Sequence, residues 1–123
     1  MEARILIVDD EPQILAFLSL TLEHAGYAVS TASNARDAIA LCSEEHFDVV
    51  LSDVRMPETS GHQLADWIAA HHPTTRTALM SGYDDIFGNC SCSPSCPVIA
   101  KPFPPQEIVA FVQAVMASSL KDY

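Results

Sequence analysis

Five polar or charged side chains that could bind a metal or a phosphoryl group lie at the end of a short apolar run or directly after one. They are Asp9, Asp10, Asp53, Ser81 and Lys101. Carboxylates that converge repel one another unless a cation neutralises them, and Mg²⁺ characteristically takes one or two carboxylates with a carbonyl, waters and phosphate oxygens. A lysine ammonium and a hydroxyl can hold the remaining oxygens of a phosphoryl group. If the fold brings these residues together, the set suits a hard cation and a phosphoryl group.

Short apolar runs alternate along the chain with segments of helical periodicity. The runs predict five strands, at residues 5–8, 28–31, 47–53, 77–81 and 98–100. Capping signals and apolar spacing predict helices at residues 12–25, 35–42, 61–72 and 104–120. With right-handed crossovers, this alternation implies an α/β fold with one parallel sheet covered by helices on both faces. The binding crevice of such a sheet lies outside the carboxyl ends of its strands.

The region between Tyr83 and Pro97 interrupts the alternation. Residues 84–87 could form barely one helical turn before a segment with Gly88, three cysteines and two prolines. The fourth helix is therefore predicted to be shortened or irregular.

Length and charge narrow the class of protein. The 123 residues are 49% hydrophobic and 18% charged, which fits one domain over residues 1–123. A formal charge of −10 argues against direct binding to nucleic acid. The apolar runs are far shorter than the roughly 18 residues of a spanning helix, and residues 1–4 do not begin a signal peptide. We therefore expect a soluble, cytoplasmic protein without membrane insertion.

Four motifs, ILIVDDEP, VVLSDVRMPETSG, ALMSGY and AKPF, occur in order, each at the end of a predicted strand. With these motifs, nearly the whole chain resembles the response-regulator receiver domains of bacterial two-component signalling, in the CheY-like superfamily. The resemblance implies a flavodoxin-like, doubly wound sheet of five parallel strands in the order 2-1-3-4-5.

The resemblance also implies a phosphorylation reaction. Asp53 would be the nucleophile that becomes an aspartyl phosphate, while Lys101 and Ser81 would contact phosphoryl oxygens. The phosphodonor would be phosphohistidine in a sensor histidine kinase or a histidine phosphotransfer protein, or a small phosphoanhydride. The domain would then switch its binding to a downstream protein. It would catalyse its own phosphorylation and dephosphorylation and would not act as an enzyme on other substrates.

A Mg²⁺ site follows from the same resemblance, with Mn²⁺ as a possible substitute. Asp10 and Asp53 would bind the metal directly, and Asp9 would assist through water or by direct contact. The backbone carbonyl of Arg55 would complete the protein's share of the ligands.

The chain departs from the family pattern at Val98. Receiver domains usually have an aromatic residue three positions before the lysine, where its rotamer reports phosphorylation. Without it, we expect output to use another surface, such as the helix near Gln13 or the segment 88–97.

A second hypothesis uses the cysteine segment. Cys90, Cys92 and Cys96 are spaced C-x-C-x3-C, and thiolates this close could bind zinc or respond to oxidants. The alternative is therefore a receiver-fold binding module that responds to metal or redox state. The spacing misses the common C-x2-C pattern, and Cys42 belongs to a predicted helix far from this segment, so an irregular loop with incidental thiols is favoured.

An aspartyl-phosphate phosphatase ranks last among the hypotheses. A haloacid-dehalogenase-like enzyme uses an acid–base carboxylate two positions after its nucleophile, and Arg55 stands at that position.

Overall fold

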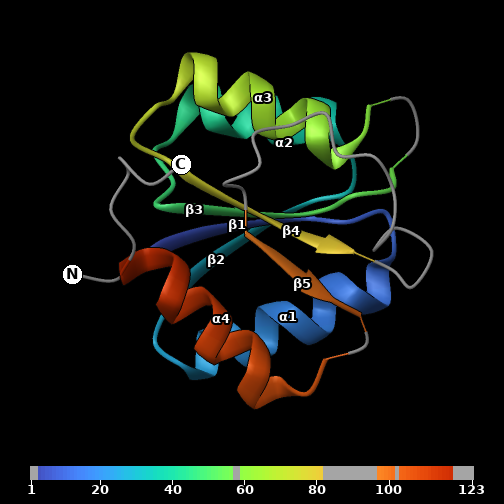
Figure 1. The fold of residues 1–123 in the computed structure, drawn as a ribbon, viewed down its shortest axis with the longest axis vertical. Coiled ribbons are helices and arrows are strands. Elements are labelled where there is room, and N and C mark those ends of the chain that lie inside the picture. Colours follow the sequence, from blue (N-terminus) through green and yellow to red (C-terminus); the bar gives the residue numbers. More distant parts are fainter. Residues whose placement is uncertain (1–2, 57–58, 82–96, 102, 118–123) are drawn as a thin grey trace.

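The computed structural model describes residues 3–56, 59–81, 97–101 and 103–117. This part of the chain contains five strands and four helices (Figure 1). Strands and helices alternate from β1 to β4, and β5 and α4 follow. The strands are β1 (Arg4–Val8), β2 (Ala28–Ala32), β3 (Val49–Asp53), β4 (Arg76–Ser81) and β5 (Val98–Ala100). The helices are α1 (Pro12–His24), α2 (Ala35–Glu44), α3 (Gly61–His71) and α4 (Pro105–Ala117). None of these helices is long and apolar enough to cross a membrane.

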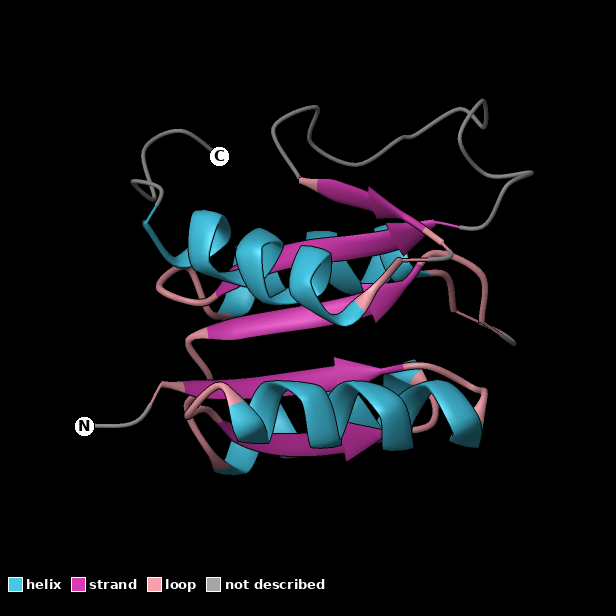
Figure 2. Cartoon of the chain, turned by 90° about the horizontal axis from the view of Figure 1, so that it is seen from below, coloured by secondary structure: helices cyan, strands magenta, loops and turns pink. Residues whose placement is uncertain are grey.

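The strands form one parallel sheet in the order β2-β1-β3-β4-β5, which confirms the predicted topology. Figure 2 shows the strand arrows pointing the same way, so all the carboxyl ends lie at one edge. The predicted end of the third strand at Asp53 is confirmed, because the ladder with β4 pairs Asp53 with Met80, whereas the strand begins at Val49 and not at residue 47. Asp53 is therefore the last residue of a strand, with its backbone fixed by the sheet.

Helices α1 and α4 cover one face of the sheet, and α2 and α3 cover the other (Figure 1). Successive residues of a strand point to opposite faces. In β1, Ile5 and Ile7 face α1 and α4, whereas Leu6 and Val8 face α2 and α3, and all four are fully buried. This double burial explains why the run from 5 to 8 is apolar without alternation.

Side-chain caps begin two of the helices. The Asn34 side chain accepts a hydrogen bond of 2.7 Å from the backbone N–H of Asp37, which confirms the predicted cap of α2. A capping box between Ser60 and Gln63 begins α3. The predicted last helix, residues 104–120, is described as helix from Pro105 to Ala117, and residues 118–120 lie outside the described part.

An aromatic stack closes the far end of α3. The Trp67 and His71 rings lie 4.5 Å apart between centroids at an interplanar angle of 18°, and His72 lies at 5.3 Å. Trp67 also packs against the buried cluster on the α2 and α3 side. The indole is therefore held between the core and two imidazoles.

The predicted irregular fourth helix and Cys90, Cys92 and Cys96 lie outside the described residues, which resume at Pro97. The fourth cysteine, Cys42, is buried on α2 with a free thiol, and burial raises the pKa of that thiol.

Glycine is required where α3 begins. A Cβ added to Gly61 would clash with the backbone carbonyl oxygen of Asp53 and would lie 3.0 Å from the Cα of Val54. The Gly61 N–H also donates to the Val54 carbonyl oxygen at 2.9 Å. The first turn of α3 thus rests directly on the backbone of the strand end.

We predict that Gly61→Ala lowers the free energy of unfolding by about 3 kcal/mol, because a clash with backbone cannot be relieved by a rotamer change. Gly26→Ala is the matched control: it has a φ of +100° but nothing within 4 Å of the added Cβ. It should cost only about 1 kcal/mol in backbone strain. Urea unfolding of both variants measures the difference, and equal losses would contradict the close approach.

Candidate functional site

The residues singled out by their chemistry gather at the carboxyl edge of the sheet. Asp9 and Asp10 follow β1, Asp53 ends β3, Ser81 ends β4, and Lys101 follows β5. Backbone hydrogen bonds fix these ends. The Asp9 N–H donates to the Ala32 carbonyl oxygen at 3.1 Å, and the Lys101 N–H donates to the Ser81 carbonyl oxygen at 2.8 Å. The sheet ladder therefore positions the site.

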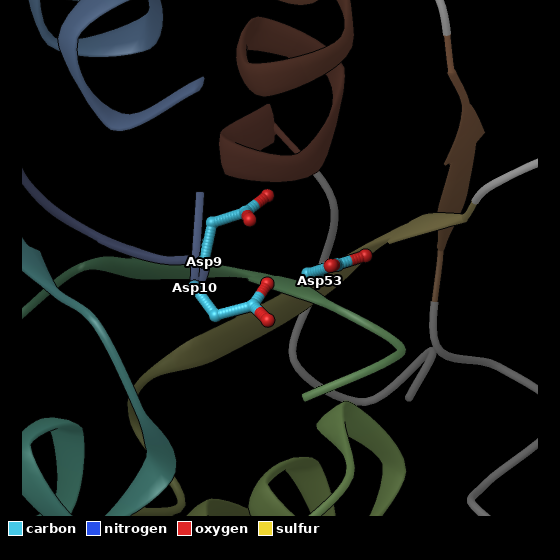
Figure 3. Close-up of side chains that lie close together, drawn as sticks. All are labelled: Asp9, Asp10 and Asp53. Atoms are coloured by element: carbon cyan, nitrogen blue, oxygen red, sulfur yellow. The ribbon is translucent and has the colours of Figure 1, made fainter. Parts of the chain in front are cut away.

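Three carboxylates converge there. One oxygen from each of Asp9, Asp10 and Asp53 lies within 4.8 Å of the others (Figure 3). Asp9 is fully buried and Asp53 is 6% exposed, whereas Asp10 lies in solvent. Three like charges this close, two of them away from water, repel strongly.

A lysine crosses to this acidic cluster from the other side of β4. The Lys101 Nζ donates to Asp9 Oδ2 at 3.0 Å and lies 3.4 Å from Asp53 Oδ1. Burial lowers the pKa of Lys101, but the hydrogen bond to Asp9 and the charges of Asp53 and Asp9 outweigh it, so the net direction is upward. The lysine remains an ammonium and neutralises part of the carboxylate charge.

One lysine does not neutralise the cluster. Burial, followed by the charge of Asp9, raises the pKa of Asp53 to about 6, against the lowering effect of Lys101. The charge of Asp10 adds a smaller increase. The ionised form of Asp53 is therefore disfavoured in the metal-free protein, and an added cation would favour it.

Both oxygens of the Asp9 carboxylate already have partners. Oδ2 accepts the Lys101 ammonium, and Oδ1 accepts the backbone N–H of Glu11 at 2.9 Å, just before α1 begins. Asp9 thus joins the strand end, the first turn of α1 and the lysine. Asp10 is the exposed carboxylate of the three.

An open hollow of about 460 Å³ lies beside the cluster. Asp10, Arg55, Met56 and Ser60 are among its lining residues. Arg55, whose carbonyl was predicted as a metal ligand, therefore lines the same hollow as Asp10. The Arg55 side chain is exposed. Ser81 is buried at the end of β4, between the strands that carry Asp53 and Lys101.

Sequence analysis missed two residues that support the Asp53 backbone. The buried Ser52 hydroxyl donates to the Asp53 carbonyl oxygen at 3.0 Å, and Gly61 packs against the same oxygen. The available signal was Gly61 itself, because glycine at a helix start often marks a close backbone approach. Ser52 gave no signal, since a serine in a strand has many ordinary uses.

Comparison with known proteins identifies the class. A family model for the response regulator receiver domain matches residues 5–113. The chain is 38% identical to the response regulator protein PilR of Pseudomonas aeruginosa over 81 residues, which is 66% of this chain and 18% of PilR. It is 32% identical to the transcriptional regulatory protein SrrA of Staphylococcus aureus, over 94% of this chain and 48% of SrrA. The chain therefore spans less than half the length of these curated relatives.

Solved structures agree with the family model. The chemotaxis response regulator CheY4 of Vibrio cholerae superposes with a TM-score of 0.81 at 28% identity, over 94% of this chain and 99% of that chain. A receiver domain protein from Clostridium thermocellum gives a TM-score of 0.84 at 26% identity, over 93% and 94%. The fold is that of the receiver domains of two-component response regulators. The chain belongs to the response regulator receiver domain family, and this assignment is supported over the cysteine-based alternative.

The raised pKa of Asp53 predicts a pH-dependent gain in stability for Asp53→Asn in metal-free protein. Between pH values of about 4 and 6 the folded state binds more protons than the unfolded state, so wild-type stability falls as pH rises. The variant escapes this loss. Its gain in the free energy of unfolding should be about 2–3 kcal/mol near pH 7.5 and roughly half of that near pH 5.

Urea unfolding in a chelator measures this gain, with Asp10→Asn as the control. Asp10 is exposed, so water solvates its carboxylate, and the Asp10→Asn substitution should change the free energy of unfolding less. A gain for Asp53→Asn that is absent, or that grows toward low pH, would contradict the site electrostatics.

Proposed function

We propose that Asp53 accepts a phosphoryl group from phosphohistidine in a sensor histidine kinase or a histidine phosphotransfer protein, and that the modified domain changes its affinity for a downstream protein. The observation that carries the proposal is the cluster of Asp53 with Asp9, Asp10 and Lys101 at the carboxyl edge of the sheet. Chemistry at this edge is typical of open parallel sheets.

The reaction is a displacement at phosphorus. A carboxylate oxygen of Asp53 forms a bond to phosphorus while the phosphorus–nitrogen bond of phosphohistidine breaks, and the electron pair returns to the imidazole. The Lys101 ammonium lies 3.4 Å from Asp53 Oδ1, so it can reach an oxygen of a phosphoryl group on that carboxylate. The Ser81 hydroxyl is proposed to hold a second phosphoryl oxygen. Small phosphoanhydrides would be alternative donors.

A divalent cation fits the donor set. Asp10 and Asp53 would bind Mg²⁺, with the Arg55 carbonyl as a third ligand and with Asp9 assisting through water or by direct contact, and Mn²⁺ could substitute. The fit is supported by carboxylate oxygens within 4.8 Å of one another and by the raised pKa of Asp53, because both indicate charge left to neutralise. When bound, the cation supplies positive charge to the carboxylates and to the oxygens of the transferring phosphoryl group.

The remaining features of the proposal concern the domain as a whole. Residues 1–123 would act as one cytoplasmic receiver that catalyses only its own phosphorylation and dephosphorylation. A net charge of −10 disfavours direct binding to nucleic acid. Val98, which stands where an aromatic residue would report phosphorylation, begins β5 with 50% of its surface exposed. We propose that output does not depend on an aromatic rotamer at this position.

Intact mass after incubation with Mg²⁺ and acetyl phosphate tests the phosphoacceptor. We expect wild type to gain about 80 Da, the mass of one phosphoryl unit, in a linkage that hydroxylamine cleaves, as expected for a carboxylate nucleophile. Asp53→Asn should gain nothing, whereas Asp37→Asn, which removes an exposed carboxylate from α2, should behave as wild type. A chelator should abolish the gain. No gain in wild type with either acetyl phosphate or a phosphoramidate would contradict the proposal.

The position of Lys101 predicts opposite effects on metal binding and on phosphorylation. Lys101→Met removes a positive charge from the Asp9 and Asp53 carboxylates, so Mg²⁺ should bind at least about tenfold more tightly. The same change should slow phosphorylation, because an ammonium that holds phosphoryl oxygens is lost.

Calorimetric titration with Mg²⁺ and the rate of mass gain measure the two effects. Arg36→Gln, which removes an exposed positive charge from α2, is the control and should change neither. Weaker Mg²⁺ binding by Lys101→Met would refute the competition between the ammonium and the metal.

A further inference from the structure

Ser52 is a polar residue in the apolar interior of the sheet. It lies one position before the end of β3, where the ladders pair it with Val8 of β1 and Leu79 of β4. All three residues are fully buried. A valine at this position would remove more apolar surface from water than a serine does. Apolar burial therefore does not explain a hydroxyl here, and the explanation lies in what the hydroxyl contacts.

The Ser52 hydroxyl contacts both ends of the segment 53–56. It donates to the Asp53 carbonyl oxygen at 3.0 Å, and its oxygen lies 4.0 Å from the sulfur of Met56. A hydroxyl has one hydrogen, so the nearer carbonyl oxygen is the main acceptor and the sulfur is a weak second one. Met56 also packs against the buried cluster on the α2 and α3 side. One buried oxygen thus contacts the first and the last residue of a four-residue segment.

The backbone between these two residues is held as well. The Val54 N–H donates to the Met80 carbonyl oxygen at 2.9 Å, and the Val54 carbonyl oxygen accepts the Gly61 N–H at 2.9 Å. Arg55 follows, and together with Val54 and Met56 it lines the hollow beside the acidic cluster. The carbonyl group of Arg55 therefore belongs to a short segment whose course is fixed on both sides of it.

We propose that Ser52 is a positioning residue for the divalent cation. Its hydroxyl fixes the course of residues 53–56 and so keeps the Arg55 carbonyl oxygen in place beside the carboxylate ligands. This role rests on the proposed function, in which Asp10, Asp53 and that carbonyl hold Mg²⁺. Ser52 is not itself a ligand, because its hydrogen is donated to backbone inside the sheet.

The chemistry of Mg²⁺ makes this position important. Mg²⁺ requires near-ideal octahedral geometry, so its affinity falls when one ligand is displaced. Groups that orient metal ligands typically change the affinity by about 10–100-fold when they are removed. Loss of the Ser52 hydroxyl should therefore weaken Mg²⁺ binding much more than it disturbs the fold.

The chain offers a matched control at the opposite edge of the sheet. Thr75, just before β4, is buried, and its hydroxyl donates to the Phe47 carbonyl oxygen at 2.8 Å. Ser52 and Thr75 thus each donate a buried hydroxyl to a backbone carbonyl near one end of β3, but only the Ser52 bond lies at the acidic edge. Ser52→Ala and Thr75→Val remove the two hydroxyls with little other change in shape. The two variants should lose similar amounts of stability toward urea.

Calorimetric titration with MgCl₂ and with CaCl₂ tests the proposal. We expect Ser52→Ala to raise the Mg²⁺ dissociation constant at least about tenfold, and Thr75→Val to raise it less than about threefold. Ca²⁺ accepts a larger and more flexible set of oxygen ligands, so its dissociation constant should rise less than about threefold in Ser52→Ala. A merely structural role would not change the preference between the two cations.

The rate of mass gain with acetyl phosphate gives a second readout. Ser52→Ala should gain mass more slowly than wild type when Mg²⁺ is limiting. At saturating Mg²⁺ its rate should return to within about threefold of wild type, because Ser52 acts on the affinity for the cation and not on the phosphoryl group.

The outcomes separate this proposal from the proposed function. If wild type binds Mg²⁺ and Ser52→Ala binds it equally well, the role of Ser52 is overturned and the cation site stands. Equal losses of Mg²⁺ affinity in Ser52→Ala and Thr75→Val, or parallel losses for Mg²⁺ and Ca²⁺ in Ser52→Ala, would also overturn it. A wild-type protein that binds no Mg²⁺ would instead refute the cation site itself.

Discussion

The contact of the Lys101 ammonium with Asp9 and Asp53 is the interaction on which the geometry of the acidic edge depends. Lysine comes from the end of β5, and the two carboxylates come from β1 and β3, so the side chain spans the end of β4. Without a positive charge there, two buried carboxylates and the exposed Asp10 would repel across a few ångströms. The order of the strands and the length of a lysine side chain are therefore matched to each other.

The same edge shows how a reactive group is maintained at a cost in stability. Asp53 has a raised pKa because it is buried among like charges, and functional sites often carry such unfavourable terms. Burial of the apolar side chains of the central strands β1 and β3, on both faces of the sheet, offsets this electrostatic cost. Ser52 and Gly61 hold the carbonyl of Asp53 from two directions. The carboxylate is thus unfavourable electrostatically, while its backbone is firmly held.

The strands, their order and the convergence of the acidic residues could be predicted because local signals agreed with the fold. Asn34 and the apolar run at 5–8 were identified by side-chain type alone. The start of β3 could not be predicted, because Phe47 is buried and apolar like a strand residue, while the strand itself begins at Val49. The close approach of Gly61 and the reach of Lys101 depend on packing between distant segments, which no local pattern records. The roles of the site residues, and the prediction for the cysteine segment outside the described residues, remain predictions.

The aromatic stack on α3 has a consequence for how motion at this edge can be observed. Trp67 is the one tryptophan of the chain, and it lies between the imidazole of His71 and the core on the α2 and α3 side. The first residue of that helix packs closely against the carbonyl of Asp53, so a movement of the strand end would displace α3 as well. Such a displacement of α3 against the sheet would change the polarity around the indole. The chain therefore contains an intrinsic fluorophore, and its emission can follow events at the acidic edge in real time without a label.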